Sequence, residues 1–193
     1  MPTGPESESA PSRPRIVALA GFMGAGKSSV GRALAALVGW AFRDLDDEIE
    51  LREKRKIREI FRGHGEAEFR RIENQGLRRV LAETTAPTVI SLGGGTFVQP
   101  ENVGVLNEYA VQVVFLEAPM DLLLQRCQVA MQPAAANIRP LAADADAFRA
   151  LYAQRLEQYR TADLTVDAAG KSFEQQAQEI ALRLGLLPAI PLS

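Results

Sequence analysis

The stretch from Arg15 to Gly31 reads RIVALAGFMGAGKSSVG and decides the fold. It joins a short apolar run, a glycine-rich turn and the opening of a helix. The P-loop pattern G-x-x-x-x-G-K-[ST] is matched without a mismatch by Gly21, Gly26, Lys27 and Ser28. Gly24 adds a further glycine inside the pattern.

The flanks of this turn make the motif specific. Ile16 to Ala20 is expected to form a buried strand, and the apolar residues after the turn repeat at helical spacing. Backbone N–H groups at such a junction can surround phosphates, Lys27 can reach the β and γ oxygens, and the Ser28 hydroxyl can ligate magnesium. A nucleoside triphosphate is therefore the expected ligand. The alternative is a glycine-rich turn that only permits close packing of helix and sheet.

Length and composition set the class of protein. A chain of 193 residues predicts one domain, or one domain with small insertions, that can bury a sizeable core. Hydrophobic content of 47% with 24% charge is typical of a soluble globular protein. The net charge of −2 gives no reason to expect nucleic-acid or membrane binding. Because Cys127 and His64 are single, a disulfide and a cysteine- or histidine-rich metal site are excluded.

The sequence predicts neither a membrane-spanning helix nor a targeting peptide. No apolar run approaches the ~20 residues that a bilayer-spanning helix needs. Residues 1–14 are rich in Pro, Ser and Glu, which predicts a disordered tail rather than a targeting peptide. Residues 15–186 are expected to form the single domain, 187–193 a second tail, and the cytoplasm is the expected location.

Carboxylates follow the second expected strand, Ala41 to Asp44. Positions two apart on a strand face the same way, so Asp44 and Asp46 could both project from its carboxyl end. Open α/β sheets bind ligands at that end. Alternatively, Asp46 or Asp47 caps the helix that follows.

Three glycines, Gly93 to Gly95, follow the third expected strand, Thr88 to Leu92. Glycines at the carboxyl end of a strand leave backbone N–H groups free for the oxygens of a ligand. A plain flexible loop is the alternative.

Two arginines lie on expected helices. Arg70, on the helix from Glu66 to Glu83, is flanked by glutamates at helical spacing, which indicates a surface salt-bridge ladder. Arg155 falls on the apolar face of the helix from Asp144 to Tyr159, where a guanidinium is costly unless it meets an anion. That anion is either a ligand or an internal carboxylate.

A third arginine, Arg139, is the single charge in the expected loop 132–143. The length of this loop favours function over simple connection, so Arg139 is either solvated or carried on a lid over a phosphate site. Further strands are expected at Val111 to Glu117 and Asp163 to Asp167. Five strands alternating with helices predict an α/β fold, a parallel sheet covered on both faces, with the architecture of P-loop NTPases.

These motifs in this order resemble the shikimate kinase family, from about Arg15 to Leu184. They are the P-loop, Asp-x-Asp at 44–46, EFRRIE at 68–73, LGGG at 92–95 and Arg139-Pro140. The resemblance implies a three-layer fold like that of nucleoside monophosphate kinases, with strand order 2-3-1-4-5, a lid and a monomeric state. It also implies transfer of the γ-phosphoryl group of ATP, with Mg²⁺, to the 3-hydroxyl of shikimate on the route to chorismate and aromatic amino acids.

The resemblance also implies residue roles. Catalysis falls to Asp46, Lys27 and Arg139. ATP is bound by Gly24, Ala25, Gly26, Lys27, Ser28, Ser29, Arg126 and Arg139. Mg²⁺ is held by Ser28 and, through water, by Asp44. Shikimate is bound by Asp46, Phe61, Phe69, Arg70, Gly93, Gly94, Gly95 and Arg155. One departure is that Glu157-Gln158 stand where the family reads Pro-Leu before Tyr159.

Other functions remain as alternatives. A kinase for another small polyhydroxy acid, such as gluconate or aminoshikimate, would use the same paired arginines. A nucleoside monophosphate kinase is disfavoured because its Asp-Gly-Phe-Pro-Arg signature is missing, and a GTPase because Asn-Lys-x-Asp is missing. A non-catalytic sensor of ATP or shikimate would not need the whole set of Lys27, Ser28, Asp44, Asp46 and Arg139.

Overall fold

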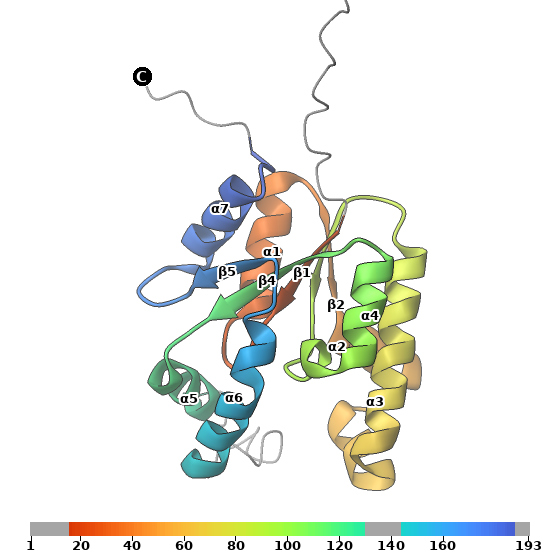
Figure 1. The fold of residues 1–193 in the computed structure, drawn as a ribbon. Coiled ribbons are helices and arrows are strands. Elements are labelled where there is room, and N and C mark those ends of the chain that lie inside the picture. Colours follow the sequence, from red (N-terminus) through yellow and green to blue (C-terminus); the bar gives the residue numbers. More distant parts are fainter. Residues whose placement is uncertain (1–15, 130–143, 188–193) are drawn as a thin grey trace, which may run out of the picture.

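A five-stranded parallel sheet forms the centre of the protein (Figure 1). The computed structural model describes residues 16–129 and 144–187. The sheet has the order β2-β3-β1-β4-β5, so the expected order is confirmed. Its strands are β1 (Ile16–Ala20), β2 (Ala41–Asp44), β3 (Thr88–Ser91), β4 (Gln112–Glu117) and β5 (Leu164–Asp167). Three of them are one residue shorter than expected.

Helices connect the strands and cover both faces of the sheet. They are α1 (Lys27–Val38), α2 (Leu45–Glu53), α3 (Ile57–Glu83), α4 (Pro100–Glu108), α5 (Met120–Val129), α6 (Ala145–Tyr159) and α7 (Phe173–Arg183), with a 3-10 turn η1 (Thr96–Val98). Helix α1 packs against α7, and α2 packs against α3 (Figure 1). None of the helices in the described ranges combines the length and the apolar character that a membrane-spanning segment requires.

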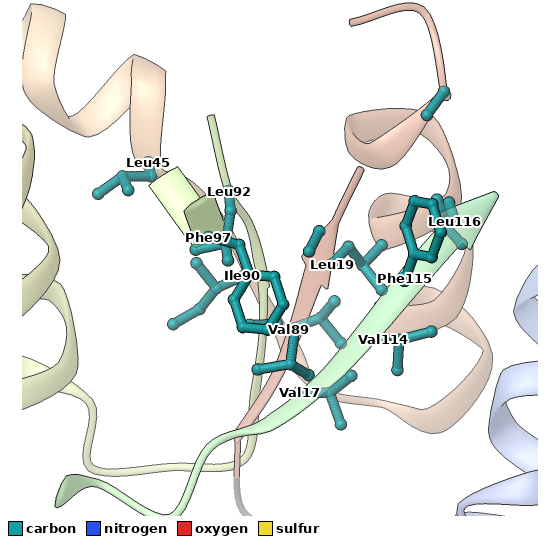
Figure 2. Close-up of a cluster of buried hydrophobic side chains, with 14 of the residues drawn as sticks. Val17, Leu19, Leu45, Val89, Ile90, Leu92, Phe97, Val114, Phe115 and Leu116 are labelled. Carbon is teal, nitrogen blue, oxygen red and sulfur yellow. The ribbon is translucent and has the colours of Figure 1, made fainter. Parts of the chain in front are cut away.

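The core lies on the sheet. Every residue of β1 is buried, as is every residue of β3, because helices remove both faces of a parallel sheet from water. Figure 2 shows side chains of β1, β3 and β4 meeting side chains from α2 and η1, among them Leu19, Ile90, Phe115, Leu45 and Phe97. This core holds the carboxyl ends of β1, β2 and β3 at one edge, where the sequence motifs lie.

Two local expectations need correction. The side chain of Asp44 caps α2 by accepting a hydrogen bond from the Asp46 backbone N–H (3.1 Å), so neither Asp46 nor Asp47 is the cap. Helix α3 begins at Ile57, not at Glu66, and it kinks at Gly65, whose φ of 78° is left-handed. The run Gly63-His64-Gly65 predicts a break with His64 in a loop, but His64 lies within the helix.

Ser172 followed three residues later by Gln175 predicts a capping box at the start of the last helix, and the structure confirms it. Ser172 and Gln175 exchange backbone and side-chain hydrogen bonds at the start of α7. The departure at Glu157-Gln158 also has a structural outcome, because α6 runs without a break to Tyr159 where a proline would disturb it. The expected tail 1–14, the expected tail 187–193 apart from Leu187, and the expected lid at 132–143, including Arg139, lie outside the described residues.

Candidate active site

The turn between β1 and α1 has the conformation that its glycines permit. Gly24 and Gly26 have φ angles of 82° and 90°, in the left-handed region that favours glycine. A Cβ at Gly24 would lie 2.8 Å from the backbone oxygen of Leu123, so the loop also needs the missing side chain. The Lys27 ammonium donates to the carbonyls of Gly21 (3.0 Å) and Phe22 (3.1 Å) and lies over the loop. The backbone N–H groups of the first turn of α1 and the Lys27 ammonium thus lie together at the start of this helix.

A cluster of oxygen atoms lies beside this loop. The Ser28 hydroxyl donates to Asp44 Oδ2 (2.6 Å) and lies 3.3 Å from the Ser91 hydroxyl. Oxygen donors are the ligands that a hard divalent cation prefers. No group of three or more His, Cys, Asp or Glu side chains able to hold a metal occurs in residues 16–129 and 144–187. The cluster therefore suits a cation whose other ligands are phosphate and water.

Asp46 lies in the first turn of α2, two residues after Asp44. Its carboxylate covers Gly93, because a Cβ there would lie only 2.8 Å from Asp46 Oδ1. Burial, followed by the charges of Asp44 and Glu73, raises the pKa of Asp46 to about 6, although the Lys27 ammonium opposes the shift. A carboxylate with such a pKa can accept a proton near neutral pH.

Arg70 is only partly the surface residue that periodicity predicts. It pairs with exposed Glu66 (3.0 Å), but also with Glu73 (2.8 Å), whose side chain is 1% exposed. The second Glu73 oxygen accepts from the Thr96 hydroxyl (2.7 Å). A Cβ at Gly95 would lie 2.6 Å from Arg70 Nη1, so the guanidinium rests directly on the glycine loop. The surface-ladder interpretation is therefore wrong for one of the two glutamates.

Arg155 reaches the same glycine loop from α6. Its Nη1 donates to the carbonyl oxygen of Gly94 (3.1 Å), which also accepts from the Tyr159 hydroxyl. Its guanidinium lies 5.9 Å from the centre of the Phe22 ring. No carboxylate among the described residues forms an ion pair with Arg155, so the internal-carboxylate alternative finds no partner there.

One cleft of about 1240 Å³ joins these groups. Its lining comes from the P-loop, α2, α3, the loop after β3 and α6. Apolar walls come from Phe61 and Phe69, whose ring centres are 4.4 Å apart. The predicted residues that line it are Gly24, Gly26, Lys27, Ser28, Ser29, Asp44, Asp46, Phe61, Phe69, Arg70, Gly93, Gly94, Gly95, Arg126 and Arg155. Ala25 is instead buried beneath the loop.

Arg126 lies at the loop end of the cleft. It donates to the Gly24 carbonyl (3.3 Å) and lies over the Phe173 ring at 5.6 Å. Sequence reasoning did not assign Glu73, Ser91 or Tyr159 to the site. These three residues lie in or near motifs of the sequence. Their burial and their hydrogen bonds, however, depend on contacts between distant segments and cannot be read from the sequence.

The arrangement has a chemical consequence. The lining of the cleft combines the P-loop and Lys27 with the guanidinium groups of Arg70 and Arg155. Asp46, Arg155 and Arg70 lie at the consecutive glycines 93, 94 and 95, respectively. A site of this kind can align a phosphoryl donor with an acceptor that carries a negative group.

Comparisons with known proteins agree with this geometry. Residues 23–184 match the family model described as shikimate kinase. Shikimate kinase from Lactococcus lactis subsp. cremoris (strain MG1363) is 41% identical over 165 residues, which cover 85% of this chain and 94% of that protein. Shikimate kinase from Geobacter metallireducens is 41% identical over 175 residues, which cover 89% and 93%.

Solved structures give the same result. Shikimate kinase from Acinetobacter baumannii in complex with shikimate has a TM-score of 0.79 and 33% identity, with 90% of this chain and 94% of that chain covered. A gluconokinase from Sinorhizobium meliloti 1021 has a TM-score of 0.58 at 19% identity, with 88% and 90% covered, a likeness that shows the fold alone.

Proposed function

This chain belongs to the shikimate kinase family, and from that premise we propose that its cleft transfers the γ-phosphoryl group of ATP to the 3-hydroxyl of shikimate. The chain is an ATP-dependent kinase of aromatic amino acid biosynthesis. The observation that carries the residue assignment is that the P-loop, Asp46 and the Arg70–Arg155 pair line one cleft.

The phosphate end of the cleft binds ATP. Backbone N–H groups from Gly24 to Ser29 surround the β and γ phosphates, and Lys27 neutralises charge that develops as the phosphoryl group moves. Arg126 and Phe173 flank the loop and contact the rest of the nucleotide. We also assign Arg139, which lies outside the described residues, to the phosphates on the ground of the family resemblance alone.

The residues present also fit Mg²⁺. Ser28 would hold the ion directly, and Asp44, 2.6 Å from the Ser28 hydroxyl, would support it through water. Bound there, Mg²⁺ supplies charge neutralisation to the β and γ phosphates.

The acceptor end of the cleft binds and orients shikimate. Arg70 and Arg155 hold its carboxylate, the N–H groups of Gly93 to Gly95 face its hydroxyls, and Phe61 and Phe69 pack against its ring. Asp46 accepts the hydrogen bond of the attacking hydroxyl and takes its proton as the oxygen–phosphorus bond forms and ADP leaves. Phosphoryl transfer needs mainly alignment and charge neutralisation, which these groups supply.

A coupled assay of ADP release tests this proposal. We expect ADP release that depends on shikimate and on Mg²⁺, and much lower rates with quinate or gluconate at equal concentration. Equal or faster turnover of gluconate would identify another polyhydroxy-acid kinase. Binding of ATP and shikimate with no turnover would identify a sensor. Either result would overturn the assignment.

We further propose that the protein is a monomer. The family resemblance implies this state, and the described residues expose large apolar side chains at five positions. They are Leu37, Leu51, Phe61, Tyr109 and Leu182. Sedimentation at increasing concentration should give a constant mass near 21.0 kDa.

A further inference from the structure

Two donors from one helix converge on a single backbone oxygen at the acceptor end of the cleft. The carbonyl of Gly94 accepts from Arg155 Nη1 (3.1 Å) and from the Tyr159 hydroxyl. The two donors are four residues apart on α6 and therefore lie on the same face of the helix. Gly94 itself belongs to the loop that lines the acceptor pocket.

The two donors differ in how firmly they are held. Tyr159 is fully buried, and its ring stacks on Phe115 of β4, with centroids 5.2 Å apart and ring planes at 15°. Burial raises the pKa of Tyr159 to about 12, although Arg155 opposes the shift, so the hydroxyl keeps its proton near neutral pH. Arg155 is only partly buried and lines the cleft, so it has room to turn toward a ligand.

The difference matters when a ligand arrives. If Arg155 turns from the Gly94 carbonyl to a substrate carboxylate, that carbonyl loses one donor. A partly buried carbonyl without a hydrogen-bond donor costs free energy, and this cost would weaken substrate binding. The Tyr159 hydroxyl keeps the carbonyl satisfied after Arg155 has moved.

We propose that Tyr159 is a positioning residue for the substrate carboxylate: by holding the Gly94 carbonyl it releases Arg155 to bind that group. Tyr159 does not touch the substrate and acts through Arg155. The inference rests on the proposed function, because it needs an anionic acceptor in the cleft. It differs from that function by assigning a role to a buried hydroxyl behind the site.

Tyr159→Phe tests the role, since the change removes the hydroxyl and leaves the stacked ring in place. We expect the KM for shikimate to rise by about three- to tenfold, the effect of one lost hydrogen bond, with the KM for ATP and kcat within about twofold of wild type. Tyr152→Phe is the matched control. Tyr152 lies on the same helix but donates to the Ala118 carbonyl (3.4 Å), which does not belong to the glycine loop.

A double-mutant cycle with Arg155→Leu tests whether Tyr159 acts through Arg155. In the Arg155→Leu background, Tyr159→Phe should no longer lower kcat/KM for shikimate, because no guanidinium remains to be released. An equal effect in both backgrounds would overturn the inference. So would equal shifts in the KM values for ATP and shikimate, or a Tyr159→Phe enzyme that behaves like Tyr152→Phe.

These outcomes are separable from failure of the proposed function. A wild-type enzyme without shikimate-dependent ADP release would refute the function and with it this inference. Wild-type turnover combined with an unchanged KM for shikimate in Tyr159→Phe would refute the inference alone. Thermal denaturation of each variant checks that the fold is retained.

Discussion

Asp46 is a carboxylate held partly out of water beside two other carboxylates. Burial first, and then the charges of Asp44 and Glu73, raise its pKa to about 6. A group in this state costs stability when it is ionised, so its retention points to a use in the cleft. Two predictions follow at the scale of this residue, one for turnover and one for stability.

Asp46→Asn should reduce kcat with shikimate by ~10² or more, because the amide cannot take the proton of the acceptor hydroxyl. Binding of ATP should change little, since the P-loop contacts do not involve this side chain. Initial rates and nucleotide titration measure the two quantities. A variant with near-normal kcat would remove Asp46 from its proposed role.

The same substitution should stabilise the protein at alkaline pH in buffer that contains EDTA. The pKa of Asp46 in the folded protein, about 6, lies above its ordinary value of 3.8, so wild type loses stability as pH rises from 3.8 through about 6. Asp46→Asn removes this loss, which we expect to be on the order of 1–2 kcal/mol after allowance for solvent contact. Urea unfolding at pH 8 and pH 4 measures it. A gain of equal size at both values would contradict the ionisation argument.

At the scale of elements, the loop between β3 and η1 connects the two sides of the cleft. Asp46 covers Gly93, Arg155 and Tyr159 bind the Gly94 carbonyl, and Arg70 rests on Gly95. Helices α2, α3 and α6 thus converge on three consecutive glycines. At two of the three positions, Gly93 and Gly95, a Cβ would lie under 3.0 Å from Asp46 or Arg70, so a side chain there would displace these groups.

Gly95→Ala should therefore raise the KM for shikimate strongly, by about tenfold or more, because its Cβ would lie 2.6 Å from Arg70 Nη1 and displace the guanidinium. Gly94→Ala is the matched comparison, since the nearest atom to its Cβ would lie at 3.5 Å, an ordinary contact. Steady-state kinetics of both variants measure the difference. A larger effect at Gly94 than at Gly95 would argue against the role given to Arg70.

At the scale of the whole molecule, residues of α3 and α6, which come from opposite halves of the chain, both line the cleft. Ligands that fill it contact elements from both halves, so they should stabilise the folded state by mass action. At about one hundred times its Kd, a ligand contributes about 2.7 kcal/mol. Shikimate should raise Tm in thermal denaturation, and gluconate at the same concentration should not. An equal rise with gluconate would contradict the assigned acceptor.

Part of this protein could be predicted from short-range pattern. The P-loop follows from the spacing of Gly21, Gly26 and Lys27, and the strands follow from apolar runs that end at turn residues. Such features depend on residues within a few positions of one another, so they can be recognised in the sequence alone. The strand order came from family resemblance, because periodicity alone does not say which strands pair.

By itself, the sequence determined the α/β class, the phosphate-binding loop and the candidate residues, because local spacing sets backbone conformation. Only the tertiary structure decided that Asp44 is the cap of α2, that Glu73 is buried beneath Arg70, and that Gly94 is shared by Arg155 and Tyr159. These facts depend on burial and on atoms brought together from distant positions. Burial changes the cost of a charge and the number of partners that a carbonyl needs, and neither quantity can be read from the order of residues.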